Sequence, residues 1–284
     1  MKRICRLSQI AVLGACLSFT CEGLGKSPVG NPTGGTSNNL LQQGEAFFNK
    51  RSVKIQDMKN FVVDSKNIDQ AISVFRKILT SNSGASRERE QAGVFFLMSL
   101  HFKAEYTGAS EDVQKALYDE GKAIGTKLSQ QYPKSAALKY WLAVQWGKWA
   151  KVFGKIAAAR QGAAEIIRDL SQDLIKLDPN YYFAGGYRVL GRLHHQSPYI
   201  PLVLSWPDNK KAVENLELAV KRGPYNILNN LFLGEALMSS GGKSNRKRAL
   251  NLLEKAAKIQ PNKSRHVEDL KDLAEVKRVL KLNR

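Results

Sequence analysis

Residues 209–261 read NKKAVENLELAVKRGPYNILNNLFLGEALMSSGGKSNRKRALNLLEKAAKIQP. This stretch contains one pattern twice: an alanine, a leucine, a second alanine and a proline at matching spacings. The two copies are Ala212, Leu216, Ala219 and Pro224, and Ala249, Leu253, Ala256 and Pro261. Alanine at such positions lets two helices cross closely, and proline ends a helix because it has no backbone N–H for the next turn. The stretch therefore predicts two helical hairpins.

The same punctuation continues toward the N-terminus, where Pro133 and Pro179 each follow a segment with helical apolar spacing. The proline spacings exceed the roughly 34 residues of a standard tetratricopeptide repeat. From residue 40 onward no convincing alternating strand pattern is present. We predict an all-α array of stacked antiparallel hairpins of the tetratricopeptide type over residues 40–284. It would have about five hairpins and a closing helix from roughly Ser264 to Leu282.

Residues 1–25 read as an export signal. Lys2, Arg3 and Arg6 precede a short apolar run, which is too short for a permanent membrane span. Leu13-Gly14-Ala15-Cys16 matches a bacterial lipobox, in which the cysteine receives a lipid. The alternative is an ordinary signal, cleaved after Gly25 for example, with Cys16 discarded. We expect a lipid anchor at Cys16, an outer-membrane address facing the periplasm, and a flexible tether over residues 26–39, which are rich in Pro, Gly, Ser and Asn.

The net charge favours some classes of binding partner, and the positions of the cysteines exclude cysteine chemistry from the folded body. The formal net charge is +19, and cleavage before Cys16 would leave +16, which favours an anionic partner. Export and the absence of a nucleic-acid module argue against nucleic acid as that partner. All three cysteines lie in the first 21 residues, so the folded body has no disulfide, thiolate metal site or cysteine nucleophile.

Three segments resemble the T component of TRAP-type transporters, a family of periplasmic lipoproteins with degenerate tetratricopeptide folds. They are ALKYWLAVQWGKWAKVFG (137–154), IKLDPNYYFAGGYRVLGRLHHQSP (175–198) and DNKKAVENLELAVKRGP (208–224). This sequence departs from the family in its longer, apolar loop YIPLVLSWPDN (199–209). The resemblance implies a non-enzymatic accessory protein. Such a protein pairs with the solute-binding P component and passes hydrophobic ligands through a channel.

The Trp-rich helix offers the first candidate ligand residues. Trp141, Trp146 and Trp149 share it, and Trp146 and Trp149 are neighbours at i, i+3. Rings at these positions can fill the core between hairpins, or they can line an apolar ligand channel.

The GGYRVLGRL segment offers Tyr187 and Arg188. Gly185, Gly186 and Gly191 weaken this helix by about 1 kcal/mol each, which calls for a close helix crossing or a backbone that admits a ligand. Arg188 could hold a ligand carboxylate in a bidentate fork or form a structural salt bridge.

We expect no catalytic residue, metal site or cofactor. His194 and His195 are adjacent and point to different faces, so they cannot easily share a metal. Acidic pairs such as Glu268-Asp269 lie at helix starts, where they offset the helix dipole. No phosphate loop, nucleophile elbow or metalloprotease motif occurs in the chain.

Three functions remain open. The first is the TRAP accessory component, with the solute-binding protein as partner and a small hydrophobic or carboxylate ligand. The second is a generic tetratricopeptide lipoprotein scaffold for envelope or outer-membrane assembly. The third is an envelope enzyme, which the lack of a catalytic set disfavours. The sequence does not decide whether the chain forms a homo-oligomer.

Overall fold

The computed structural model describes residues 36–81, 85–197 and 204–283. In these residues it contains twelve α-helices, one 3₁₀ turn and two short strands. The helices are α1 (Thr36–Asn49), α2 (Lys66–Thr80), α3 (Ser86–Tyr106), α4 (Glu111–Gln131), α5 (Ala136–Phe153), α6 (Lys155–Arg160), α7 (Ala163–Leu177), α8 (Tyr181–Gln196), α9 (Asn209–Arg222), α10 (Ile227–Ser239), α11 (Lys243–Ala256) and α12 (His266–Asn283). Among the described residues, no helix combines the length and apolarity that crossing a bilayer requires.

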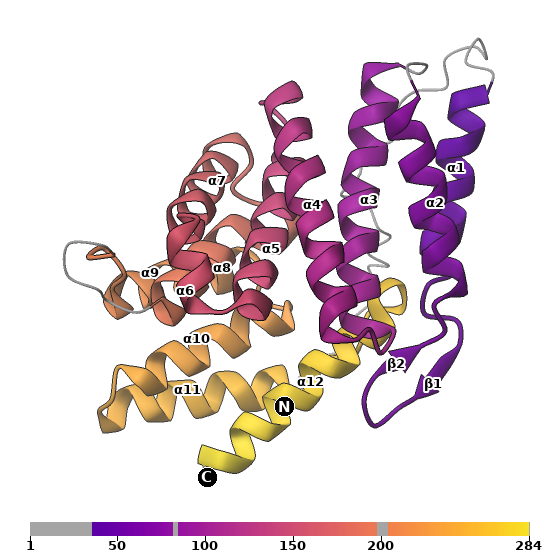
Figure 1. The fold of residues 1–284 in the computed structure, drawn as a ribbon. Coiled ribbons are helices and arrows are strands. Elements are labelled where there is room, and N and C mark those ends of the chain that lie inside the picture. Colours follow the sequence, from indigo (N-terminus) through magenta and orange to yellow (C-terminus); the bar gives the residue numbers. More distant parts are fainter. Residues whose placement is uncertain (1–35, 82–84, 198–203, 284) are drawn as a thin grey trace, which may run out of the picture. The chain divides into compact units, whose positions relative to one another are not determined.

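The helices pack as successive hairpins. The pairs α1–α2, α3–α4, α5–α7, α8–α9 and α10–α11 each pack together, and each pair also touches the next one along the chain. Figure 1 shows α1 to α5 standing side by side, with α8 to α11 following them. The five predicted hairpins and the closing helix are confirmed, and each of the four prolines follows the end of a helix.

The two copies of the alanine–leucine pattern form the predicted close crossings. Ala212, Leu216 and Ala219 are fully buried in α9, and their counterparts in α11 are equally buried. A Cβ placed on Gly191 of α8 would lie 2.6 Å from Leu216 Cγ, and one on Gly234 of α10 would lie 2.9 Å from Leu253 Cγ. These distances leave no room for a larger side chain at the crossing.

Side chains cap several helix starts, which fixes where each hairpin arm begins. Ser110 and Ser135 accept hydrogen bonds from the backbone N–H groups three residues later, and Asn226 does the same for α10. Asp208 accepts one from Lys210 N at 2.8 Å at the start of α9. Each cap satisfies a backbone donor that the helix itself leaves free.

Several local features differ from the sequence prediction. Residues 55–63 hold a small antiparallel hairpin of β1 (Ile55–Asp57) and β2 (Val62–Val63), which the sequence did not indicate. The strands were missed because they are too short to show alternation. A short extra helix, α6, lies inside the third hairpin. Helix α1 begins at Thr36, so the last residues of the segment expected to be a flexible tether (26–39) are helical. The expected export signal and Cys16 lie outside the described residues.

A further difference is at the start of α8. Tyr182, Phe183 and Ala184 have φ values of 47°, 60° and 59°, which is left-handed backbone. Each such non-glycine residue costs roughly 1–2 kcal/mol relative to a right-handed turn. This turn places Tyr182 against Tyr140 and Trp141 of α5, with ring centroids 5.0 and 5.3 Å apart.

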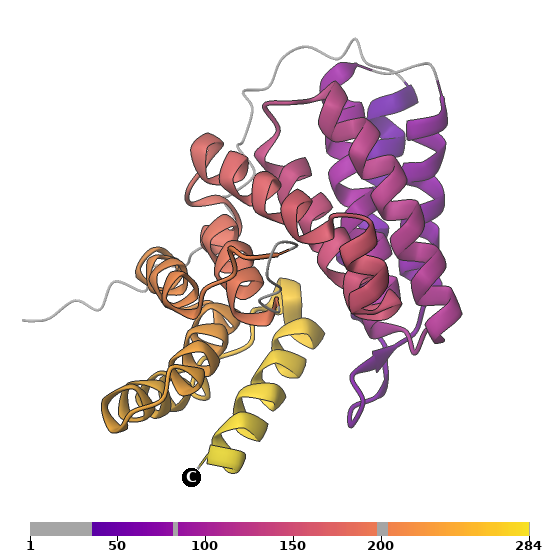
Figure 2. The same ribbon diagram turned by 60° about the vertical axis from the view of Figure 1, so that its left-hand side comes forward.

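The closing helix α12 contacts both the last hairpin and the N-terminal half of the chain. Figure 2 shows α12 running beside α10 and α11, against which it buries Leu273, Val276 and Leu280. Its first turn also reaches the N-terminal half of the chain, because Val267 is fully buried in the core cluster that α1 to α8 build. Glu268 Oε1 accepts from Arg51 Nη2 at 2.7 Å, across 217 residues of sequence.

Candidate functional site: an aromatic and charged cavity

The body contains a partly open cavity of about 750 Å³ between α3, α5, α7, α8, α10 and the start of α12. Aromatic rings and small side chains form much of its wall. The aromatic lining residues are Phe48, Phe102, Tyr106, Tyr140, Trp141, Tyr182 and Phe232. A volume of this size with aromatic and aliphatic side chains in its wall is typical of small-molecule sites, although this wall also carries many charged groups.

Helix α5 keeps one side of the cavity open because it presents small residues there. Ala143, Gly147, Ala150 and Gly154 all line it, at spacings of three or four residues. A Cβ placed on Gly147 would meet no other atom within 4 Å. The open volume is therefore a property of the residue types on this face.

Two of the five candidate ligand residues, Trp141 and Arg188, line the cavity. Trp146 and Trp149 are buried elsewhere, where Lys122 Nζ lies 4.1 and 3.4 Å from their ring centroids. Trp149 Nε1 also donates to Asp119 Oδ1 at 2.7 Å. These two rings pack against the protein's own lysine rather than face the cavity.

The candidate ligand residue Tyr187 and the two adjacent histidines, His194 and His195, also do not line the cavity. Tyr187 is half-buried, with the Arg222 guanidinium 5.4 Å from its ring. His194 Nδ1 accepts from Asp208 N, and its ring lies edge-on to Trp206 at 5.0 Å, so the last residues of the apolar loop pack back on α8. His195 contacts Ser239 instead. In the parts of the chain that the structure describes, no group of His, Cys, Asp and Glu has a metal-binding arrangement.

Arg188 is 3% exposed, and no carboxylate among the described residues forms an ion pair with it. Its Nη2 donates to Tyr140 OH at 2.7 Å, and its Nη1 donates to Asn229 Oδ1 at 2.9 Å. The salt-bridge alternative from the sequence is therefore wrong within the described chain. Nη1 and Nη2 also donate to Phe183 O and Tyr182 O at 3.3 Å, so neutral acceptors hold this buried cation.

The start of α12 contributes a charged end that the sequence did not predict. Arg265 donates to Asp269 Oδ1 at 3.2 Å and to Tyr182 OH, and its Nη2 lies 3.9 Å from Asp272 Oδ2. Glu268, which also lines the cavity, pairs with Arg51 through one oxygen, while its Oε2 is buried and has no hydrogen-bond partner among the described residues. Glu268 and Asp269 do lie in the first turn, but they act as ion-pair partners as well as dipole partners.

Burial shifts the titration of the groups at this end. It raises the pKa of the Asp272 carboxyl to about 7, although the nearby Arg265 opposes the shift. It also lowers the pKa of His101 to about 3; this residue is in the cavity wall, and its Nδ1 has no hydrogen-bond partner in the part of the chain that the structure describes. His101 is therefore neutral at physiological pH, and Asp272 is partly protonated.

The sequence does not predict these contacts because the partners are far apart along the chain. Arg51 and Glu268 are 217 residues apart, and Tyr182 and Arg265 are 83 residues apart. The sequence indicates one of these ion pairs, because Arg265 and Asp269 are spaced i, i+4 at a helix start. The same spacing is common in surface ion pairs, so it does not identify a buried site.

The cavity carries more basic than acidic groups. Seven basic side chains line it: Arg51, Lys148, Lys151, Lys155, Arg188, Arg192 and Arg265. Three acidic side chains do so: Glu165, Glu268 and Asp272. Lys151 and Lys155 make no ion pair within the described residues, whereas Lys148 Nζ bonds Glu105 Oε2 at 2.6 Å. Burial would raise the pKa of Glu105, but Lys148 holds it well below its usual value.

No protein-family model and no curated protein matches this chain. Among solved structures, it is similar to TTC0263, a thermophilic TPR protein from Thermus thermophilus. The TM-score is 0.54 at 15% identity, over 85% of this chain and 98% of that one. A structure of the MamA protein is matched with a TM-score of 0.47 at 18% identity, over 80% and 96% of the two chains. The likeness to the Thermus protein shows the fold, an all-α array of the tetratricopeptide type. This likeness does not support the narrower TRAP-type assignment.

Proposed function

We propose that this chain is a non-catalytic binding protein that holds a small ligand in its interior cavity and contacts a protein partner through its helical-repeat body. The observation that carries the ligand role is the cavity of about 750 Å³, lined by Trp141, Tyr140 and Tyr182. The partner role is supported by the tetratricopeptide-type fold, because such arrays present extended surfaces to other proteins.

The lining residues favour a ligand with an apolar body and a carboxylate. Aromatic and small side chains suit the apolar part. Arg188 supplies a buried positive charge that no side-chain carboxylate neutralises within the described chain, and Lys151 and Lys155 add two more unpaired cations. A carboxylate would gain charge-assisted hydrogen bonds from Lys151 and Lys155. Arg188 would attract it through charge alone, because its Nη1 and Nη2 already donate to acceptors of the protein.

Filling the cavity tests the ligand role. Gly147→Leu places a side chain in open space, so it should reduce binding of a fluorescent fatty acid at least about tenfold without loss of thermal stability. Gly147→Ala is the matched control, since it adds one methyl group at the same position and should bind almost normally. Equal binding by Gly147→Leu and the natural chain would reject the cavity as the site.

The identity of the partner divides the proposal into two finer versions. In the first, the chain is the accessory component of a TRAP-type transporter, anchored at Cys16 on the periplasmic side of the outer membrane, and its partner is the solute-binding protein. The resemblance of segments 137–154 and 175–198 supports this version. In the second, it is a lipoprotein scaffold for envelope or outer-membrane assembly, which needs only the repeat fold.

Pull-down from envelope extracts separates the two versions. Recovery of a periplasmic solute-binding protein supports the transporter role. Recovery of outer-membrane assembly or cell-wall proteins alone supports the scaffold role. Labelling with a radioactive fatty acid, compared between the natural chain and Cys16→Ser, tests the anchor independently of the partner.

A further inference from the structure

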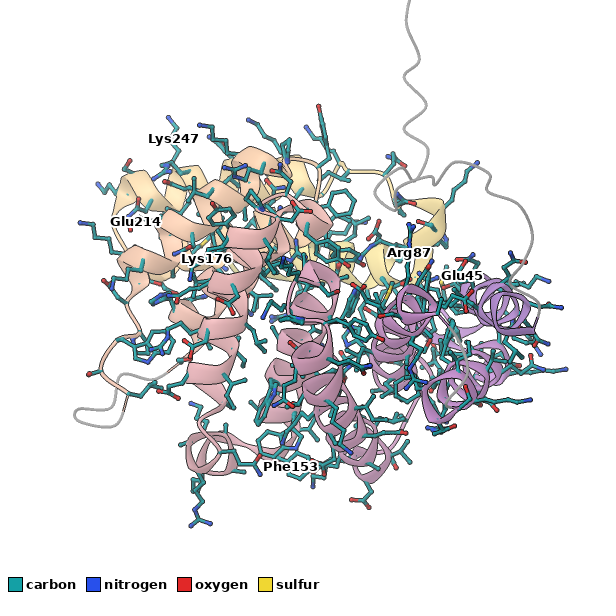
Figure 3. All side chains as sticks on the ribbon, turned by 90° about the horizontal axis from the view of Figure 1, so that it is seen from above. Glu45, Arg87, Phe153, Lys176, Glu214 and Lys247 are labelled. Carbon is teal, nitrogen blue, oxygen red and sulfur yellow. The ribbon has the colours of Figure 1, made fainter. Side chains whose placement is uncertain are left out.

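One end of the helical array carries a cluster of cations, which we call the basic end patch. It consists of Lys243, Arg246 and Lys247 at the start of α11, and Lys281 and Leu282 at the end of α12. The two helices meet there because Arg246 Nη2 donates to Asn283 O at 2.5 Å. All five side chains are exposed, and Figure 3 shows Lys247 at the outer edge, pointing away from the body.

The charge of this patch is not neutralised within the described chain. None of its four cations forms an ion pair there, although Arg248 and Arg278 on the same two helices pair with Glu217 and Glu275 at 2.5 Å. The first turn of α11 contains no acidic residue, so the positive end of its dipole adds to the cations. Glu254, two turns later, borders the same shallow hollow and is the one acidic residue lining it.

The composition of the patch fits a bilayer surface better than a protein surface. Three of its cations are lysines, which are depleted in protein–protein interfaces, and it has no exposed aromatic anchor. Leu282 is 69% exposed beside Lys281, so an apolar side chain stands among cations. Basic residues next to exposed apolar ones are the usual means by which a helical surface binds anionic lipid headgroups.

We propose that the basic end patch binds the surface of a bilayer that contains anionic phospholipids. The lysine ammonium groups pair with headgroup phosphates, and Leu282 enters the interfacial region. This role concerns the outer surface of α11 and α12, and it does not depend on what the cavity holds.

Vesicle co-sedimentation of the full chain tests the proposal. The vesicles are phosphatidylcholine alone, or phosphatidylcholine mixed with phosphatidylglycerol. Because each basic residue near an anionic surface contributes about fivefold in partitioning, we expect the natural chain to prefer the anionic vesicles at least about tenfold at low salt. The preference should vanish at high ionic strength.

A charge-matched pair of variants locates the effect. Lys243→Glu/Lys247→Glu/Lys281→Glu should remove the preference. Lys59→Glu/Lys127→Glu/Lys134→Glu makes the same change in net charge at exposed lysines elsewhere and should keep most of it. Glutamate at position 243 also suits a helix start, so the first variant should stay folded, and its circular dichroism verifies this.

Two results would overturn the proposal. One is an equal loss in both variants, which would reduce the effect to net charge. The other is a natural chain without preference for anionic vesicles. If that chain were instead retained on a polyglutamate matrix, the patch would belong to an acidic protein partner. The full chain is used throughout, so any contribution of its N-terminal segment is common to all arms.

Discussion

Individual glycines in α5 and α8 have opposite roles. A Cβ on Gly191 would lie 2.6 Å from Leu216 Cγ and 3.1 Å from the backbone oxygen of Ala212, which cannot move aside easily. Gly191→Ala should therefore lower the free energy of unfolding by about 1–3 kcal/mol. Gly147→Ala, which meets no atom within 4 Å, should raise it by up to about 1 kcal/mol through helix propensity alone. Denaturant titration of both variants checks the pair, and a loss at Gly147 as large as that at Gly191 would contradict it.

Asp272 and His101 give stability opposite dependences on pH. Because the pKa of Asp272 is raised to about 7, the native chain holds a proton there that the unfolded chain releases near pH 4, so stability falls as pH rises across that interval. Because the pKa of His101 is lowered to about 3, the unfolded chain takes up a proton that the native chain does not, so stability rises up to about pH 6.5.

The two slopes oppose each other between about pH 4.5 and pH 6.5, and single variants separate them. Relative to the natural chain, Asp272→Asn should become progressively more stable as pH rises from about 4.5 to 7. His101→Gln should lose its advantage over the same rise, since that advantage exists only where the unfolded histidine is charged. Unfolding free energies measured at several pH values decide this, and parallel curves for all three chains would refute it.

At the scale of elements, helix boundaries were predictable and their long-range contacts were not. Pro224 and Pro261 mark helix ends because proline acts on its own backbone, within one turn. Ala212 and Ala249 mark crossings because the partner helix is the next or the previous one in the chain. The left-handed turn at Tyr182 had no sequence signal, since the three residues that adopt it are not the glycines that such backbone usually requires.

The contact between the α12 start and the end of α1 depends on a buried ion pair. Arg51 and Glu268 side chains are 6% and 12% exposed and lie 2.7 Å apart. Removing one partner leaves the other buried and unpaired, so Glu268→Ala should cost about 3 kcal/mol or more. Arg51→Met combined with Glu268→Leu should cost clearly less than the two single losses added together, because no unpaired charge remains.

A double-mutant cycle measures this coupling, with the exposed pair Arg278–Glu275 as the reference. Those side chains are 59% and 40% exposed, so their coupling should stay below about 0.5 kcal/mol. If the Arg51–Glu268 coupling were equally small, the ion pair would not be what holds α12 to α1.

For the molecule as a whole, α12 decides whether the chain behaves as an open array. In an open array each repeat contacts only its neighbours, and a disturbance stays local. Here Lys271 Nζ donates to Glu105 O at 3.0 Å, and Val267 is buried with the core of the first hairpins. The candidate cavity depends on this contact because Glu268 and Asp272 come from α12 and Arg265 directly precedes it. The sequence could predict the helix from its own periodicity, but the place where it docks depends on residues far away along the chain.

Substitutions of two valines in α12 test whether the docking of this helix stabilises the N-terminal hairpins. Val267 and Val276 are both fully buried, the first in the core cluster of α1 to α8 and the second in the cluster of α10 to α12. Each change to alanine removes the same two methyl groups at a cost of about 1–3 kcal/mol. Val267→Ala should speed amide hydrogen exchange near Arg51 and in the last turns of α3, far away in sequence, whereas Val276→Ala should speed it in α10 and α11. Exchange that rises in α12 alone for Val267→Ala would mean that the first hairpins are stable without the closing helix. Identical maps for the two variants would mean that the whole chain opens as one unit.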